Sequence, residues 1–193
     1  MYDLILKNIA RFIQLTPDET DRFTSIIKTR TLRKRQYLVQ AGDVFRYECF
    51  VNKGALRIYH IDNNGQERIV NFAFEGWWTG DMYSFLSGQP ALYNVDALED
   101  CELLMIEKNN LEQLYIDIPK FDRFFRILLQ NAYIAMQRRI SDGMSLSAEQ
   151  RYIDFLNRYP QFEQRLTLRQ IASYLGITPE SLSRIRRQRM SKN

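Results

Sequence analysis

The residues whose chemistry is easiest to interpret lie near the end of the chain, after Gly176. Arginine can pair bidentately with the O6 and N7 atoms of guanine, glutamate can accept a hydrogen bond from cytosine N4, and serine can contact phosphate. Side chains of these three types surround the apolar residues Leu182 and Ile185 on one predicted helix. The pattern predicts a helix face suited to the major groove of DNA. The predicted DNA-binding residues are Arg169, Thr178, Glu180, Ser181, Ser183, Arg184, Arg186, Arg187 and Arg189.

Two short helices are predicted to position this face. Thr167 with Gln170 three residues later is typical of a capping box, and Gly176 permits a sharp turn at the end of the first helix. Thr178 then caps the second helix, with Pro179 at its first position. The pattern predicts a helix-turn-helix, and the alternative is a solvated basic face on a helical hairpin. The residues spaced to fill the angle between the helices are Ile171, Ala172, Leu175, Ile177, Leu182 and Ile185.

The positive charge of the chain is concentrated in the same region. The chain has a formal net charge of +4. Residues 151–193 hold nine basic and three acidic groups, a net of +6, whereas the 150 residues before them hold 18 basic and 20 acidic groups, a net of −2. This distribution favours a polyanionic partner for the C-terminal segment.

A long helix is predicted from Pro119 to about Asp142, because apolar residues recur there at helical spacing without an internal Gly or Pro. Gly143 is expected to end this helix, and Ser147 to begin another that runs to Arg158. Apolar residues four and three positions apart form a coiled-coil seam, which we interpret as a dimer interface. The alternative is a helix packed on its own domain. The predicted interface residues are Phe121, Phe125, Leu128, Ala132 and Ala135.

Short runs of alternating apolar residues before the long helix predict strands. We expect two helices ahead of them, the second capped at Thr16 and ending near Thr29. Asn64-Gly65 is a strong signal for a hairpin turn between two of the strands. Strands of this length and spacing are typical of a small antiparallel barrel or jelly roll. The predicted strands cover residues 37–39, 47–51, 55–61, 68–74, 93–98 and 102–106.

The composition argues against several other classes of protein. The single histidine, His60, cannot form a multi-histidine metal site, and Cys49 with Cys101 are too few for an iron–sulfur or all-cysteine zinc site. We therefore expect no metal, no cofactor and no enzymatic activity. No apolar stretch approaches the roughly 18 residues that cross a bilayer, and the N-terminus lacks the features of a signal peptide. A cytoplasmic protein is expected.

A small barrel, a long helix and a helix-turn-helix in this order resemble the Crp/Fnr superfamily of transcription regulators, which is named after the cyclic-AMP receptor protein and the fumarate and nitrate reductase regulator. Residues 50–59, followed by Gly65-Gln66-Glu67-Arg68, are similar to the family's strand-turn-strand pattern. In the second helix of the helix-turn-helix, Glu180, Ser181 and Arg184 match base-reading and phosphate-contacting positions of the family. Pro179 replaces the first Arg of the family pattern there, which implies a different operator.

The resemblance also implies an effector pocket near Gly80-Asp81-Met82, which stands where the cyclic-nucleotide binders have Gly-Glu-Leu. Those proteins hold the nucleotide phosphate with an Arg-Ser or Arg-Thr pair about ten residues later, where this chain reads Leu92-Tyr93-Asn94. No Lys or Arg lies between Arg68 and Lys108, and seven acidic residues do. We expect that the effector is not cyclic AMP, and an unknown small molecule stays open. The predicted pocket residues are Gly80, Asp81, Met82, Tyr83, Tyr93 and Asn94.

These features predict an α+β chain in three parts. Residues 1–118 form an effector or sensor domain, a β-barrel or jelly roll like a cyclic-nucleotide-binding domain, with flanking helices. Residues 119–145 form a dimerisation helix, and residues 146–193 form a DNA-binding helix-turn-helix domain. The expected partners are a second copy of the chain, double-stranded DNA with an inverted repeat, and RNA polymerase, but no membrane. The alternative function is an effector-free barrel protein that acts through protein contacts.

Overall fold

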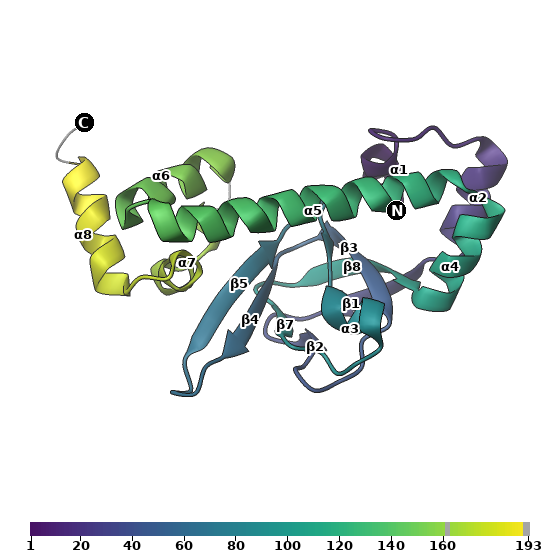
Figure 1. Ribbon diagram of the computed structural model, residues 1–193. Helices are drawn as coiled ribbons and strands as arrows, with labels where there is room; N and C mark the ends of the chain where they lie inside the picture. The colour runs from purple at the N-terminus through teal and green to yellow at the C-terminus, as the bar shows by residue number, and fades with distance from the viewer. Residues whose placement is uncertain (161–162, 191–193) are drawn as a thin grey trace. The chain divides into compact units, whose positions relative to one another are not determined.

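The computed structural model describes residues 1–160 and 163–190. Its strands form two sheets, and most of its helices precede or follow them (Figure 1). The last three residues of the predicted DNA-binding part, and residues 161–162 within it, lie outside the described residues. The elements are α1 Asp3–Ile9, α2 Pro17–Ser25, β1 Lys28–Leu32, β2 Tyr37–Val39, β3 Tyr47–Lys53, β4 Leu56–Ile61, β5 Glu67–Ala73, β6 Trp78–Thr79, α3 Met82–Ser87, β7 Asn94–Ala97, β8 Cys101–Glu107, α4 Lys108–Asp117, α5 Lys120–Ser145, α6 Ala148–Arg158, the 3₁₀ turn η1 Glu163–Arg165, α7 Leu168–Leu175 and α8 Pro179–Met190.

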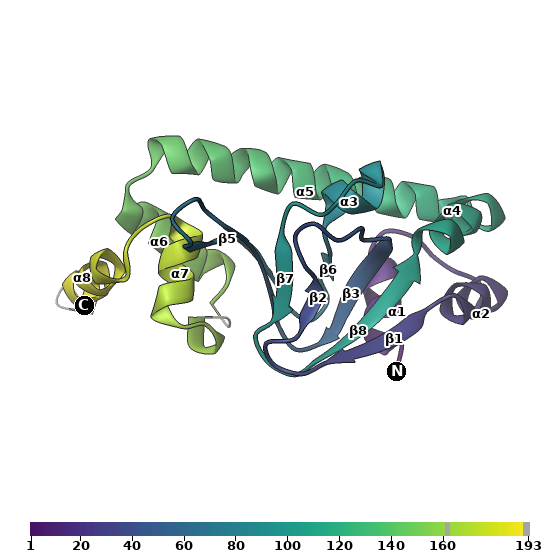
Figure 2. The same cartoon turned by 90° about the horizontal axis from the view of Figure 1, so that it is seen from below.

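The predicted jelly roll is confirmed. One sheet has the strand order β1-β8-β3-β6 and the other has the order β2-β7-β4-β5. The pairing of β8 with β1 and with β3 is antiparallel, and these three strands lie side by side in Figure 2. In the second sheet β7 pairs antiparallel with both β2 and β4. The two sheets thus supply the inner faces that a jelly roll packs together.

The first sheet separates two hydrophobic cores, because successive side chains of a strand point to opposite faces. Cys49 and Val51 of β3 point into the core between the sheets, where they meet Leu56 and Val95 of the second sheet. Phe50 of β3 points the other way, into a core shared with helices α1, α2, α4 and the first turns of α5. The barrel is therefore stabilised from both sides of one sheet.

The helix boundaries follow from local capping. Thr16 and Ser147 each form a capping box with the residue three positions later, Glu19 and Gln150, so α2 and α6 begin where the sequence predicts. The prediction that Gly143 ends the long helix is wrong, because α5 continues to Ser145. Ser147 caps the following helix two residues after α5 ends. The end of α5 therefore does not need a glycine in the left-handed conformation.

Other elements differ from the sequence prediction near the N-terminus and around the strands. The second helix was predicted to end near Thr29 but ends at Ser25, and residues 28–32 form the edge strand β1. Strand β6 and helices α3 and α4 were not predicted. All but the last residue of β1 are exposed, so this strand lacks the apolar alternation on which strand prediction depends.

The chain forms two compact units. The first comprises Met1–His60 and Val70–Leu129, and the second comprises Ile61–Ile69 and Gln130–Asn193. The β4–β5 hairpin tip thus belongs with the C-terminal helices, and α5 contributes to both units. The domain boundaries at residues 118 and 145 stay predictions. None of the helices described here is long and apolar enough to cross a lipid bilayer.

Candidate nucleic-acid interface

The C-terminal helix pair forms as its local signals predict. Thr167 Oγ1 accepts a hydrogen bond from Gln170 N, and Gln170 Oε1 accepts one from Thr167 N at 2.8 Å, which completes the capping box of α7. Gly176 ends this helix with a φ of +69°, in the left-handed region that glycine tolerates. The hydroxyl of Thr178 accepts from Ser181 N at 3.2 Å and so caps α8. The predicted helix-turn-helix geometry is confirmed.

A small apolar core fixes the orientation of α8. Ala172 and Leu182 are fully buried where α7 and α8 meet, and Ile171, Leu175 and Ile185 are buried around them. Tyr152 and Phe155 of α6 are buried in the same unit. Because Leu182 and Ile185 face this core, the opposite side of α8 must face solvent.

Polar contacts within the second unit hold α7 in place. The hydroxyl of Ser173 accepts a hydrogen bond from Ile69 N at 3.0 Å and donates one to Glu67 O at 2.9 Å. The guanidinium of Arg139 donates to the carbonyls of Ile69 and Tyr174, both at 3.2 Å. The helix before α8 is thereby tied to the β4–β5 hairpin tip and to α5.

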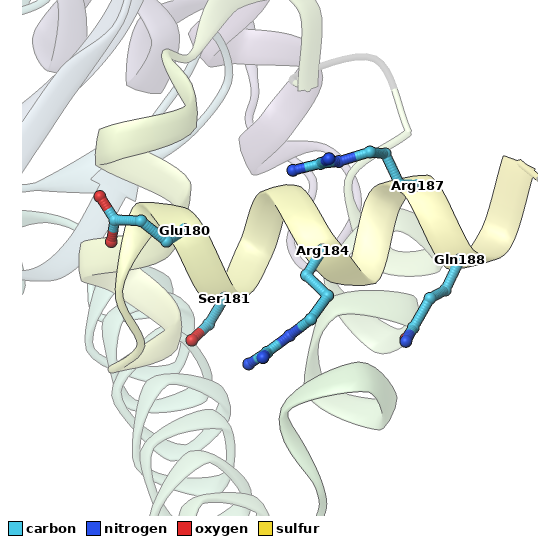
Figure 3. Close-up of a pocket in the computed structure, with 5 residues that line it drawn as sticks. All are labelled: Glu180, Ser181, Arg184, Arg187 and Gln188. Atoms are coloured by element: carbon cyan, nitrogen blue, oxygen red, sulfur yellow. The ribbon is translucent and has the colours of Figure 1, made fainter.

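The solvent-facing side of α8 carries a stripe of polar side chains, which we call the α8 stripe. It lines a hollow with a volume of about 380 Å³. Figure 3 shows Ser181, Arg184 and Gln188 pointing to the same side of the helix. Four stripe residues are exposed, and Ser181 is half-buried. The stripe consists of Glu180, Ser181, Arg184, Arg187 and Gln188.

Four predicted DNA-binding residues therefore lie in the stripe, and Gln188 was missed by the sequence analysis. Gln188 lies four positions after Arg184 and seven after Ser181, which places it on the same helix face. This spacing could have identified Gln188 as a DNA-binding residue. A side-chain amide can form two hydrogen bonds with adenine. The missed residue thus has the same kind of chemistry as the predicted ones.

The other predicted DNA-binding residues lie outside the stripe. The hydroxyl of Thr178 is engaged in the cap of α8, and it also lies 3.2 Å from the hydroxyl of Ser181. The guanidinium of Arg189 lies 5.8 Å from the ring centroid of Tyr152, within cation–π range. Ser183 and Arg186 are half-buried, whereas Arg169 is exposed on α7. Their contacts with DNA stay predictions.

The predicted effector region is organised by the buried carboxylate of Asp81. This side chain caps α3 by accepting a hydrogen bond from Ser84 N at 2.7 Å. Its second oxygen accepts from Leu92 N and from Tyr93 N, both at 3.0 Å. Only 1% of Asp81 is exposed. Three backbone N–H groups of the kind that bind phosphate are therefore bonded to a carboxylate of the chain itself.

The remaining predicted pocket residues have different surroundings. Met82 packs against the core between the first sheet and the helices, and Tyr83 is 47% exposed. The side-chain oxygen of Asn94 accepts a hydrogen bond from Ala41 N at 3.1 Å. Gly80 is required, because a Cβ there would lie 2.7 Å from the ring of Phe45. A shared effector pocket of these residues stays a prediction.

The predicted dimer seam on α5 also needs correction. Phe121 is fully buried and Phe125 is 6% exposed, because both belong to the core of their own chain. Leu128 packs against the same core, and only Ala132 and Ala135 of the predicted set are exposed. The exposed apolar residues of α5 lie further along the helix. They include Leu129, Tyr133, Ile134, Met136 and Ile140, which are 42–59% exposed.

The chain is similar to proteins of known function over most of its length. Residues 29–117 match the model of the cyclic nucleotide-binding domain. The fumarate and nitrate reduction regulatory protein of Vibrio cholerae is 28% identical over 89% of this chain and 72% of its own length. The transcriptional activator protein Anr of Pseudomonas aeruginosa is 26% identical over 95% of this chain and 79% of its own length.

Solved structures share the fold. The c-di-GMP responsive global regulator CLP of Xanthomonas campestris superposes with a TM-score of 0.74 at 18% identity, over 92% of this chain and 93% of that one. FixK2 of Bradyrhizobium japonicum superposes with a TM-score of 0.69 at 21% identity, over 86% of each chain. The relatives named above are a regulatory protein and a transcriptional activator, not enzymes. Together these similarities support a DNA-binding transcription regulator of the Crp/Fnr type.

The residues around Asp81 disfavour the phosphate of a cyclic nucleotide. Its phosphate would need unoccupied N–H donors or a basic side chain, yet Asp81 takes the three N–H groups of Ser84, Leu92 and Tyr93. No Lys or Arg lies between Arg68 and Lys108 in the sequence. A second anion beside the Asp81 carboxylate would be repelled.

Proposed function

We propose that this chain is a homodimeric, sequence-specific regulator that inserts α8 into the major groove at each half of an inverted repeat, and that no cyclic nucleotide controls it. We also infer that it acts in the cytoplasm with RNA polymerase as a partner, as a transcription regulator must. The observation that carries the proposal is the α8 stripe. It is a row of hydrogen-bonding side chains on the outer side of the second helix of a helix-turn-helix.

The chemistry of the stripe suits base reading. Arg184 lies in the middle of it and is exposed, so its planar guanidinium is available to a guanine. Glu180 in the first turn can accept from a cytosine amino group, while Ser181 and Arg187 can meet phosphates on either side. The positive net charge of this segment supports association with DNA of any sequence.

Two copies of α5 can form the dimer through the exposed apolar side chains that follow its buried first turns. Leu129, Tyr133, Met136 and Ile140 are spaced by four, three and four residues, which is the spacing of a coiled-coil seam. All four are exposed in the single chain. An apolar stripe on a helix normally packs against another element, so this stripe is available to a second copy. This seam replaces the one that the sequence analysis placed on Phe121 and Phe125.

Selection from random DNA duplexes tests the proposal directly. The full chain should enrich an inverted repeat whose half-sites lie about 34 Å apart, one turn of DNA. Arg184→Ala should lose about 1–3 kcal/mol of binding free energy per half-site and lose its preference at one base pair. The proposal is contradicted if the full chain enriches no sequence. It is also contradicted if Arg184→Ala keeps the wild-type preference at every base pair.

Sedimentation of the wild type and of two variants tests the dimer. Met136→Glu places a charge in the proposed seam and should yield monomers at micromolar concentration. Asn131→Glu, an exposed position on the opposite side of α5, should remain dimeric. Equal behaviour of the two variants would show that the seam is elsewhere.

Calorimetric titration with cyclic AMP and cyclic GMP should give no binding, and a micromolar affinity for either contradicts the effector proposal.

A further inference from the structure

The carbonyl groups at the end of helix α7 have two kinds of hydrogen-bond partner. The last four carbonyls of an α-helix find no partner within the helix itself. In α7 the first two of these, from Ala172 and Ser173, accept hydrogen bonds from the backbone N–H groups of Ile177 and Gly176, at 3.0 and 3.2 Å. The turn of the helix-turn-helix thus satisfies these two carbonyls.

Two arginines from other helices bond to the remaining two carbonyls. Arg139 Nη2 of α5 donates to Tyr174 O at 3.2 Å, and Arg139 Cζ lies 4.3 Å from the ring centroid of Tyr174. Arg151 of α6 donates from Nη2 to Leu175 O at 3.3 Å and from Nη1 to Leu146 O at 2.7 Å. Both guanidinium groups lie at the negative end of the α7 dipole. We call Arg139 and Arg151 the arginine pair.

The stability of its surroundings does not explain Arg151. Its Nε atom is buried and has no hydrogen-bond partner within residues 1–160 and 163–190. A buried N–H group without an acceptor costs free energy. The two carbonyl bonds of Arg151 nevertheless join the corner between α5 and α6, at Leu146, to the end of α7. An apolar side chain at this position could not make that connection.

The arginine pair acts where the direction of α8 is set. Two residues separate the end of α7 from Thr178, the cap of α8. On α5, Arg139 lies between Met136 and Ile140 of the proposed dimer seam. This part of α5 belongs to the same compact unit as α8. A single side chain therefore connects the helix that carries the seam with the turn that precedes α8.

We propose that Arg139 and Arg151 are positioning residues, which fix the direction of α8 relative to α5 and thereby set the half-site spacing that the dimer accepts. The inference rests on the proposed function. A guanidinium is planar and donates from several N–H groups in fixed directions, so it can hold two carbonyls in one geometry. A lysine ammonium keeps the charge but lacks this fixed geometry.

The experiment measures how steeply DNA binding depends on half-site spacing. The inverted repeat selected by the wild type is compared with duplexes that have one base pair more or less at the centre, which rotates one half-site by about 35° relative to the other. The wild type should bind the altered duplexes at least about tenfold more weakly. Arg139→Lys with Arg151→Lys should bind the selected repeat more weakly and lose less than about threefold on the altered duplexes, because α8 is held less firmly.

A duplex with a single half-site separates positioning from folding of the helix pair. The double variant should bind it within about twofold of the wild type, because the base contacts of one α8 helix do not depend on the second copy. All binding is measured at a temperature where circular dichroism shows the variant folded. If the double variant is unfolded there, the single variants Arg139→Lys and Arg151→Lys are measured instead, and each should reduce the spacing dependence.

Charge is controlled in the same series. The double variant keeps both positive charges, so its affinity should depend on salt concentration as that of the wild type does. The control variant Arg126→Lys with Arg138→Lys makes the same exchange at two exposed positions of α5. It should match the wild type on every duplex.

The outcomes separate the two proposals. A wild type that binds all three spacings equally, or a double variant with the wild-type spacing dependence, overturns the positioning role while the proposed function stands. Equal losses of affinity for the single half-site and for the repeat would assign the two arginines to the folding of the helix pair, which also overturns it. A wild type that selects no inverted repeat overturns the proposed function, and this inference with it.

Discussion

Helices α3 and α8 both begin with a side-chain cap, but the two caps have different surroundings. Asp81 caps α3 by accepting from Ser84 N, and Thr178 caps α8 by accepting from Ser181 N. Asp81 is buried and also binds two amides of the loop that follows α3. Thr178 is exposed and uncharged, and the helix after it carries Arg184 and Arg187 on its open side.

The difference lies in the side chains that surround the start of each helix. A helix N-terminus attracts negative charge, and in α3 the chain supplies that charge itself. In α8 the cap is neutral, the carboxylate of Glu180 lies in the first turn, and the arginines of the stripe face solvent. The amides around the start of α3 are thus bonded to a buried carboxylate of the chain, while the arginines that follow the start of α8 are exposed.

The largest expected effect comes from removing the buried carboxylate of Asp81. Asp81→Ala leaves three backbone N–H groups without their acceptor, so the free energy of unfolding should fall by about 3 kcal/mol. Asp81→Asn should lose less, because one amide oxygen still accepts. Urea unfolding of the purified variants measures both values.

An exposed carboxylate provides the control for this change. Asp43 is exposed in the loop before β3, and Asp43→Ala should change the free energy of unfolding by less than about 0.5 kcal/mol. Equal effects of the two alanine substitutions would mean that Asp81 does not hold the loop, and the contrast with α8 would be lost.

A smaller effect is expected from Glu48, a barrel carboxylate without the hydrogen bonds that Asp81 has. Burial raises the pKa of Glu48 to about 8, from 4.5 for the ordinary group. The folded chain therefore holds this proton more tightly than the unfolded chain, and stability should fall as pH rises from 5 to 8. Between pH 5 and pH 7 the free energy of unfolding should fall by about 2.5 kcal/mol.

Unfolding of Glu48→Gln across the same pH range measures this contribution. The variant should lose most of the decline, because glutamine has no proton to release. Glu102→Gln, at an exposed position of the neighbouring strand β8, should keep the wild-type profile. A Glu48→Gln profile parallel to that of the wild type would show that the carboxylate is not buried as a proton-binding group.

The contrast between α3 and α8 also explains what the sequence could predict. The cap of α7 depends on Thr167 and Gln170, three positions apart, and the turn after α7 depends on the conformational freedom of Gly176, so local rules suffice for both. The role of Asp81 depends on the amides of Leu92 and Tyr93, 11 and 12 residues away. Only the folded loop brings these amides to the carboxylate.

The predicted dimer seam included buried residues for a related reason. Helix α5 has apolar residues on several faces between Phe121 and Ile140, so more than one seam satisfies the heptad spacing. Which face is buried depends on the barrel core, which takes Phe121, Phe124 and Phe125. Periodicity predicted the helix, whereas the assignment of its faces required the tertiary structure.

The smallest expected effect concerns Arg187, at the edge of the α8 stripe. If Arg187 meets a phosphate while Arg184 reads a base, Arg187→Ala should weaken binding to the selected operator and to scrambled DNA by the same factor. The slope of the logarithm of affinity against the logarithm of salt concentration should become shallower by about one unit per lost contact. Gln188→Ala removes no charge, so its slope should equal that of the wild type. An Arg187→Ala variant that loses operator preference at a constant salt slope would make Arg187 a base-reading residue. The open side of α8 would then be specialised for bases along its whole length, and the phosphate contacts would have to come from residues outside the stripe.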